Sequence, residues 1–187
     1  MSDLSQPVLP NLQVAPSTLE QIPQLNQMIV QSARELSRGY YTEQEAESAI
    51  KYVFGVDTAL VNDGSYFTAM LDGRLAGCGG WSRRRTLYGG DQRPMGADEF
   101  LDPACDPARI RAFFIAPEAA RRGVGKALFE ACKQAALAHG YQSLELMATL
   151  PGVPFYKVLG FEKVEDVADT LPDGVTIRFE RMRLKIA

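Results

Sequence analysis

The sequence predicts a mixed α/β fold, and three observations carry that prediction. Residues 65–82 contain two strand-like segments around a tight turn at Gly73, which is typical of a β-hairpin. Two later strand-like segments, residues 109–115 and 142–148, enclose an amphipathic helix over residues 122–138. Helices that lie between strands in this way favour a mixed sheet with helices packed on it.

Length and composition predict one folded domain. The chain has 187 residues, of which 46% are hydrophobic and 23% charged, an ordinary globular balance that excludes wholesale disorder. We expect a single domain over residues 12–187. A flexible lead-in is expected at residues 1–11, where Pro7 and Pro10 stand among small polar residues.

Charge and hydropathy exclude several classes of protein. The 20 Lys and Arg residues face 23 Asp and Glu residues, so the net charge of −3 excludes a broadly basic protein that coats nucleic acid. No apolar run approaches the roughly 20 residues that cross a bilayer. The first residues lack the basic start and apolar core of a secretory signal. We therefore expect a cytoplasmic protein with no nucleic-acid or membrane partner.

Cysteine and histidine usage predicts no metal site. Cys78, Cys105 and Cys132 are odd in number and form no closely spaced pair, and His139 is the single histidine of the chain. We expect three reduced thiols. His139 precedes Gly140, so it is interpreted as a residue of a helix end.

The first half of the chain shows a strand followed by two capped helices. Residues 12–15 alternate as a short strand does, and Thr18 with Gln21 has the spacing of a capping box, so a helix begins near Gln21. Thr42 and Glu45 repeat that spacing ahead of a second helix.

The remaining segments are a long loop and the last elements of the sheet. Residues 83–108 are rich in Gly and Pro, and we expect one long loop, a feature that is uncommon and often functional. In the strand that follows, Ile110, Ala112 and Phe114 are expected on one face. Residues 161–164 and 175–184 supply two final strands.

The start of the helix at residues 122–138 has the character of an anion site. Gly123 and Gly125 allow a ligand to approach the backbone, because neither carries a Cβ atom. The first amides of a helix have no intrahelical partner and favour a phosphate. Arg121, Arg122 and Lys126 add positive charge to this turn. The sequence therefore predicts a diphosphate site here.

Other nucleotide motifs fit this turn poorly. A nucleoside triphosphate loop needs Ser or Thr after its lysine, and Ala127 follows Lys126. A dinucleotide fingerprint needs a third glycine where Leu128 stands. The remaining alternative to a diphosphate site is a purely structural helix start. In that case the glycines serve packing and the basic side chains lie in solvent.

A second motif lies about thirty residues downstream, at Pro154-Phe155-Tyr156-Lys157-Val158-Leu159-Gly160-Phe161. With the turn Ala120-Arg121-Arg122-Gly123-Val124-Gly125-Lys126-Ala127-Leu128, it resembles the GCN5-related N-acetyltransferase (GNAT) family over residues 109–165. The resemblance implies a mixed, centrally splayed β-sheet flanked by helices. It also implies that acetyl-CoA, the acyl donor, binds in the V-shaped opening of that sheet.

The resemblance also implies how this chain would hold the cofactor. Phe114 and Ile115 would lie on the strand that pairs with the pantetheine arm. The pyrophosphate would be held by backbone amides of Arg122, Gly123, Val124, Gly125 and Lys126.

Two positions depart from the family pattern. Ala120 replaces a Gln or Arg, whose side-chain contact Arg121 or Arg122 would supply. Thr149 stands where many members have an Asn that contacts the pantetheine arm.

Tyr156 matches the frequent general acid of the family. Acetyl transfer to an amine expels a thiolate, and a phenol aimed at the sulfur can protonate it. The alternative is a tyrosine packed at the edge of the core. A backbone donor on residues 113–115 would stabilise the oxyanion.

The general base and the acceptor site stay open at this level. Residues 109–115 contain no carboxylate, so Glu145, Asp98, Glu99 or a water molecule could accept the proton of the amine. Aromatic candidates for the acceptor pocket are Tyr40, Tyr41 and Trp81, each of which could instead serve packing. The basic run Arg83-Arg84-Arg85 could bind an acidic acceptor or form a solvated face.

The sequence therefore predicts an acetyl-CoA-dependent N-acetyltransferase that works by direct attack in a ternary complex. The first alternative is a non-catalytic acyl-CoA-binding or sensing domain, and the second is a regulatory interaction module that binds no nucleotide. A small amine, an antibiotic, an amino acid or a protein N-terminus all remain open as acceptors, as does a homodimer.

Overall fold

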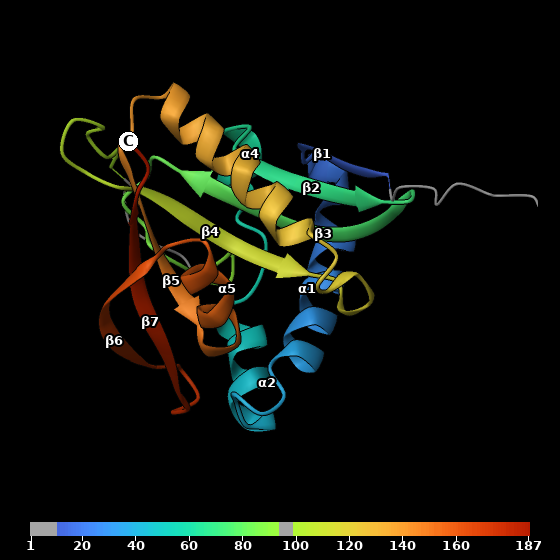
Figure 1. Cartoon of the computed structure of the whole chain (residues 1–187). Coiled ribbons are helices and arrows are strands. Elements are labelled where there is room, and N and C mark those ends of the chain that lie inside the picture. Colours follow the sequence, from blue (N-terminus) through green and yellow to red (C-terminus); the bar gives the residue numbers. More distant parts are fainter. Residues whose placement is uncertain (1–10, 94–98) are drawn as a thin grey trace, which may run out of the picture.

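A seven-stranded mixed sheet organises the protein, with strand order β1-β2-β3-β4-β5-β7-β6 (Figure 1). The computed structural model describes residues 11–93 and 99–187. Residues 1–10 of the predicted lead-in lie outside these ranges, and so does the candidate base Asp98. All neighbouring strands pair antiparallel except β4 and β5, which are parallel. The strands are β1 Leu12–Pro16, β2 Tyr66–Leu71, β3 Arg74–Ser82, β4 Ala108–Ile115, β5 Ser143–Thr149, β6 Glu162–Thr170 and β7 Thr176–Lys185.

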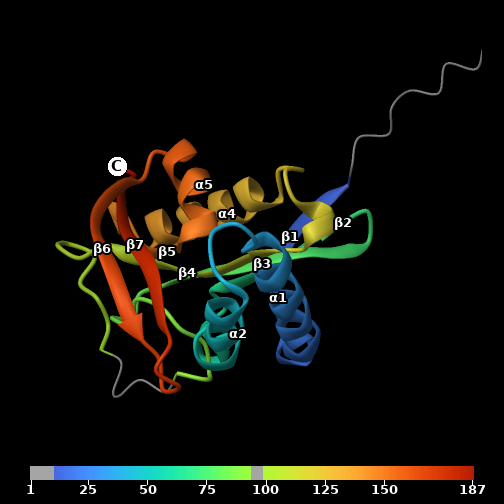
Figure 2. The same cartoon turned by 90° about the horizontal axis from the view of Figure 1, so that it is seen from below.

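Helices cover both faces of the sheet. Helices α4 and α5 lie on one face, and α1 and α2 lie on the other (Figure 2). The helices are α1 Ile22–Leu36, α2 Glu43–Tyr52, α3 Thr58–Asn62, α4 Val124–Ala138 and α5 Val153–Val158. The predicted mixed α/β architecture is confirmed, while the short helix α3 was not predicted.

The predicted helix starts are confirmed where local chemistry sets them. The Glu45 amide donates to Thr42 Oγ1 at 3.2 Å and the Thr42 amide donates to Glu45 Oε2 at 2.7 Å, a complete capping box. Helix α4 begins at Val124, two residues later than predicted. Arg121 and Gly123 have φ angles of 64° and 83°, and this left-handed backbone cannot continue a helix.

The sheet splays between β4 and β5, as the family resemblance implied. These strands pair only at Ala108 with Leu144 and at Arg109 with Glu145. Beyond that point β5 pairs with β7 along its whole length, and β4 stays with β3. The two halves of the sheet therefore open away from one another.

A bulge in β4 corrects one expectation. Ala112 has a φ of 50°, and the register between β3 and β4 shifts at this point, so two residues of β4 oppose one residue of β3. The prediction that Ile110, Ala112 and Phe114 share one face is therefore wrong. Phe113 and Phe114 both line the space between the separating strands.

The three cysteines are free thiols, as expected. Cys78 and Cys132 are buried and Cys105 is exposed, and burial raises the pKa of Cys78 to about 12. Within the described residues no group of His, Cys, Asp and Glu could hold a metal ion. No helix of the described part of the chain has both the length and the apolar character to cross a membrane.

Candidate active site

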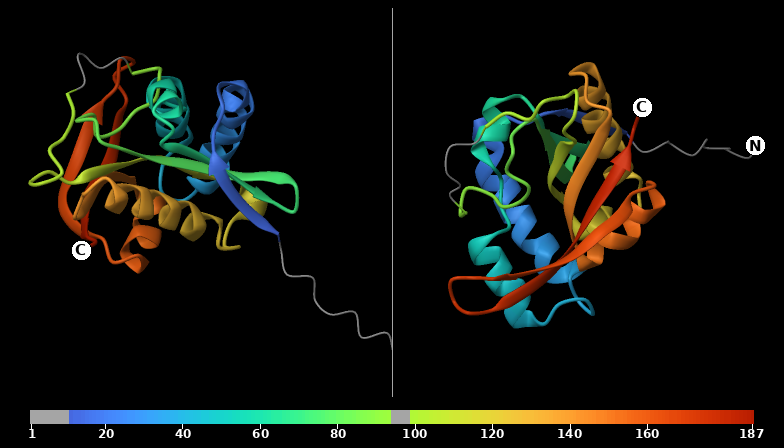
Figure 3. Two further views of the ribbon diagram at one scale, coloured as in Figure 1. Left: turned by 90° about the horizontal axis from the view of Figure 1, so that it is seen from above. Right: turned by 90° about the vertical axis from the view of Figure 1, so that its left-hand side faces the viewer.

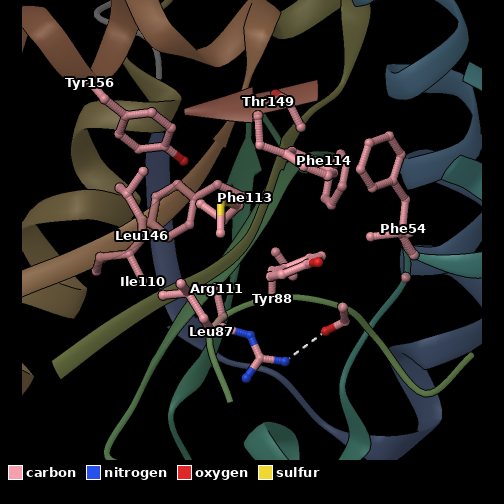
Figure 4. Close-up of a pocket in the computed structure, with 16 residues that line it drawn as sticks. Phe54, Leu87, Tyr88, Ile110, Arg111, Phe113, Phe114, Leu146, Thr149 and Tyr156 are labelled. Carbon is pink, nitrogen blue, oxygen red and sulfur yellow. Dashed lines mark hydrogen bonds between the residues drawn. The ribbon is translucent and has the colours of Figure 1, made fainter. Parts of the chain in front are cut away.

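A pocket occupies the opening between β4 and β5 (Figure 4). Its walls come from β4, β5, α5, β7, the connection between α2 and α3, and the loop after β3. The lining residues are Val53, Phe54, Gly55, Leu87, Tyr88, Gly89, Ile110, Arg111, Ala112, Phe113, Phe114, Leu146, Met147, Thr149, Tyr156 and Phe179. Phe114, Thr149 and Tyr156, three of the predicted site residues, therefore meet in one place.

The edge of β4 that faces β5 offers backbone groups to a ligand. The Ala116 amide donates to the Ala76 carbonyl of β3 at 2.9 Å. Successive amides of an extended strand point to opposite edges, so the amide of Ile115, next to Ala116, points away from β3. Beyond Arg109, β5 pairs with β7 and no longer with β4. The edge of β4 that faces β5 is therefore open to an extended chain of amides.

The start of α4 carries backbone donors that precede the first helical bond. That bond runs from the Ala127 amide to the Gly123 carbonyl at 3.1 Å. The amides of Val124, Gly125 and Lys126 therefore have no earlier carbonyl of the helix to bind, and no side chain caps this end. Such a terminus favours an anion.

The predicted basic residues lie around this terminus. Arg121, Arg122 and Lys126 are exposed. Arg122 forms an ion pair of 3.5 Å with Asp72 in the turn between β2 and β3. This pair is half-exposed, so it holds the guanidinium only weakly. Val124, in contrast, is a core residue whose side chain faces away from solvent.

The two glycines of the motif have different local roles. Gly123 has left-handed backbone, and a Cβ there would meet no atom within 4 Å. A Cβ on Gly125 would lie 3.1 Å from Cζ of Phe155 in α5. Gly125 therefore also allows α4 and α5 to pack closely, a role that the sequence pattern did not reveal.

Tyr156 lies in α5, and its ring packs against the rings of Phe155 and Phe161. The ring centroids of Phe155 and Phe161 lie 5.2 and 5.6 Å away. Its hydroxyl points into the pocket (Figure 4). Burial raises the pKa of Tyr156 well above its ordinary value, so the phenol keeps its proton across the physiological range.

Glu145 lies in a buried ion cluster and does not line the pocket. Its carboxylate accepts from Arg109 Nη1 at 2.5 Å and from Arg183 Nη2 at 2.6 Å. Both oxygens of the Glu145 carboxylate are therefore held by guanidinium groups. Glu99, a second candidate base, has an exposed carboxylate that lies 3.5 Å from Arg85. Neither residue meets Tyr156 in the pocket.

The predicted aromatic acceptor residues lie elsewhere. Tyr40 is exposed, and Trp81 packs on His139 with ring centroids 4.8 Å apart. His139 caps the end of α4, as predicted, and its Nδ1 lies 2.8 Å from the Ala135 carbonyl. Tyr41 is buried, donates to the Arg178 carbonyl at 2.5 Å and accepts from the Leu150 amide at 2.9 Å.

The basic run after β3 has partners within the chain. Arg83 lies over the ring of Phe100 with a distance of 4.5 Å to its centroid, and Arg84 binds Asp63 at 2.8 Å. Arg85 is more than half exposed and pairs with Glu99. These contacts anchor the loop, and the three arginines do not line the pocket.

Sequence reasoning missed Phe54, Leu87, Tyr88 and Arg111. Arg111 is nearly inaccessible, and its guanidinium donates to Asp57 Oδ2 at 2.9 Å and to the carbonyls of Thr86 and Gly89. The sequence did hold a signal for Arg111, because it lies in the middle of an apolar strand. A charge in such a place is buried only where other groups of the protein pair with it.

Comparisons with known proteins agree with this geometry. The sequence model described as the acetyltransferase (GNAT) family matches residues 30–161. A comparison with curated proteins gave no significant match.

Solved structures share the fold. A GCN5-related N-acetyltransferase from Rhodopseudomonas palustris, described as a class-II aminotransferase, has a TM-score of 0.68 at 18% identity, over 95% of this chain and 96% of that one. PaiA N-acetyltransferase from Thermoplasma acidophilum, solved with coenzyme A, has a TM-score of 0.63 at 16% identity, over 94% and 99%. A GNAT family acetyltransferase from Brucella melitensis, solved with acetyl-CoA, has a TM-score of 0.55 at 15% identity, over 95% and 89%.

At these identities the structural likeness shows a common fold. The family match covers more than half of the chain and includes both the turn at Gly123 and the helix of Tyr156. The sheet also splays between β4 and β5, as the resemblance to the family implied. On the family match, the chain belongs to the GNAT family of acetyltransferases.

Proposed function

We propose that this protein transfers the acetyl group of acetyl-CoA to an amine by direct attack in a ternary complex. Three features carry the proposal. The unpaired edge of β4 and Tyr156 border the same pocket, and the start of α4, with its free backbone donors, packs at Gly125 against Phe155, the neighbour of Tyr156. Each feature suits a different part of acetyl-CoA.

The diphosphate would bind at the start of α4. The amides of Val124, Gly125 and Lys126 would donate to its oxygens, and the side chains of Arg121 and Arg122 would add charge. The pantetheine amides would pair with the open edge of β4 near Phe114 and Ile115. Thr149, on the facing strand β5, would contribute a hydroxyl in place of the amide that many relatives have.

The chemical step would then proceed at the pocket. The amine nitrogen attacks the thioester carbon, and a C–N bond forms while the carbonyl oxygen becomes an oxyanion. A backbone amide of β4 beside the bulge at Ala112 would stabilise that charge. As the oxyanion collapses the C–S bond breaks, and Tyr156 donates its proton to the departing thiolate. Of the candidate bases, Glu145 and Glu99 are engaged elsewhere and Asp98 lies outside the described residues. In this proposal water takes the proton of the amine and returns one to the Tyr156 phenolate.

A non-catalytic acyl-CoA-binding domain is the alternative. It would use the same edge of β4 and the same helix start, and it would have no need of a phenol aimed at the thioester. The placement of Tyr156 in the pocket favours catalysis.

Two measurements test the proposal. Isothermal titration with acetyl-CoA should show binding, and a panel of amines should release free thiol at a rate that depends on enzyme and amine. Binding without release of thiol for any amine favours the non-catalytic domain. Absence of binding overturns both.

A further inference from the structure

The segment of residues 86–93, here called the strap, is bound tightly to β4. The guanidinium of Arg111 donates to the Thr86 carbonyl at 3.0 Å and to the Gly89 carbonyl at 2.6 Å. Arg111 also bonds Asp57, which lies just before α3. One buried cation therefore holds both the strap and the connection between α2 and α3 over the pocket.

The strap also bonds directly to the connection between α2 and α3. The Gly90 amide donates to the Val53 carbonyl at 2.9 Å, and Gln92 Nε2 donates to the Phe54 carbonyl at 2.7 Å. A Cβ on Gly90 would lie 2.6 Å from the Gly55 carbonyl oxygen, so the two backbones touch. These two walls of the pocket form one continuous surface.

The hairpin of β6 and β7 joins the strap from the other side. The Tyr88 hydroxyl donates to Asp169 Oδ2 at 2.9 Å, and Arg93 forms an ion pair with the same carboxylate. The ring of Tyr88 packs on Phe179 of β7, with centroids 5.3 Å apart. Tyr88 is therefore fixed at both its ring and its hydroxyl.

The same hairpin reaches α2 and the turn before it (Figure 3). Ser48 of α2 donates to the carboxylate of Asp173 at 2.8 Å, and Tyr41 bonds to Arg178 of β7. The strap, the connection between α2 and α3, α2 itself and the hairpin are thus bonded to one another in a closed ring, of which the strap, the connection and β7 line the pocket. An extended chain that crossed this ring would have to break one of these bonds.

The side chains inside the ring are aromatic and apolar. Phe54 and Phe114 meet edge to face with centroids 5.4 Å apart, and Tyr88 packs on Phe179. The charge of Arg111 is already balanced by Asp57. Among the described lining residues Arg111 is the one charged side chain. Such walls favour an apolar or aromatic group and offer no partner to a second charge.

We infer that the acceptor is a compact primary amine that carries an apolar or aromatic group, and that extended peptides and polyamines are poor acceptors. This inference rests on the proposed acetyl transfer. In this inference Tyr88 sets the shape of the acceptor site, and the closed ring of bonded segments limits the length of the acceptor.

The first experiment compares acceptors with the full chain. Thiol release is measured with 2-phenylethylamine, spermidine and a hexapeptide with a free N-terminus, and acetyl-CoA binding is titrated in parallel. We expect kcat/KM for 2-phenylethylamine to exceed that for the other two by at least about tenfold. Equal or higher values for the peptide or spermidine overturn the inference and leave the acetyl transfer standing. Failure of acetyl-CoA to bind overturns the proposed function itself.

The second experiment changes Tyr88. In Tyr88→Ala, kcat/KM for 2-phenylethylamine should fall by about tenfold, mainly through KM, because an aromatic wall is lost. Affinity for acetyl-CoA should stay within about twofold of wild type. Tyr40→Ala, at an exposed tyrosine outside the pocket, is the matched control and should change neither value. An unchanged KM in a folded Tyr88→Ala protein overturns the role of Tyr88.

Discussion

Arg109 of β4 and Glu145 of β5 face each other at the last residue pair before the two strands separate. Their side chains form an ion pair of 2.5 Å, and Arg183 of β7 binds the other carboxylate oxygen. The cluster therefore ties three adjacent strands together at the point where the sheet opens. Glu145 is 3% exposed, so this ion pair lies in a low-dielectric environment where loss of one partner is costly.

The first prediction concerns that cluster. Glu145→Gln should lower the free energy of unfolding by about 3 kcal/mol, because two guanidinium groups lose their anion and Arg109 is mostly buried. Urea denaturation measures the change. Glu47→Gln is the control, since Glu47 pairs with Arg34 at the exposed surface, and it should cost less than about 1 kcal/mol. Equal effects of the two substitutions would show that the cluster contributes no special stability.

The second prediction concerns the proposed diphosphate site. Gly125→Glu should weaken acetyl-CoA binding at least tenfold, about 1.4 kcal/mol, because it brings a negative charge to the start of α4. Any side chain here also meets Phe155. Gly125→Gln has nearly the same size without the charge, so it isolates the packing effect and should bind more tightly than Gly125→Glu. Equal affinities of the two folded variants would place the diphosphate elsewhere.

The third prediction concerns Tyr156. Tyr156→Phe keeps the ring between Phe155 and Phe161 and removes the hydroxyl, so stability and acetyl-CoA affinity should change little. The turnover number should fall by roughly 10²-fold, since a positioned acid is lost. An acyl donor with a better leaving thiol should recover part of the rate. A variant as fast as wild type, under conditions where chemistry limits the rate, rules out the general-acid role.

The fourth prediction concerns pH and the bond between the hairpin and the strap. Burial opposes ionisation of Asp169, but the hydrogen bonds from Arg93 and Tyr88 outweigh it and lower the pKa of this carboxyl below its ordinary value. A lowered folded-state pKa adds stability above the ordinary carboxyl pKa, and that stability is lost as the pH falls through the folded-state value.

Asp169→Asn should therefore destabilise the protein near pH 7, and the difference from wild type should shrink as the pH falls below the ordinary carboxyl pKa. Urea denaturation at several pH values measures this trend. Asp166→Asn, on the same strand and at a carboxylate that is 77% exposed, is the control and should show little effect. A difference for Asp169→Asn that does not vary with pH contradicts the assignment.

Local sequence determined the elements whose boundaries depend on neighbouring residues. The capping box of Thr42 and Glu45, the hairpin turn at Gly73 and the glycine start of α4 are all interactions within a few residues. These contacts form wherever the segment lies in the fold, so the pattern alone predicts them. The splayed sheet and the place of Tyr156 were predicted from the family resemblance of two motifs.

Tertiary structure decided the wall of the pocket that we propose for the acceptor. Phe54, Tyr88, Arg111 and Phe179 come from four separate segments, and no spacing in the sequence brings them together. Glu145 is a second example. The sequence predicts that it lies in a strand, but its two arginine partners depend on the order of the strands in the sheet. The physical reason is that pairing of distant strands and burial of charge are set by the whole fold, whereas caps and turns are set by backbone geometry over a few residues.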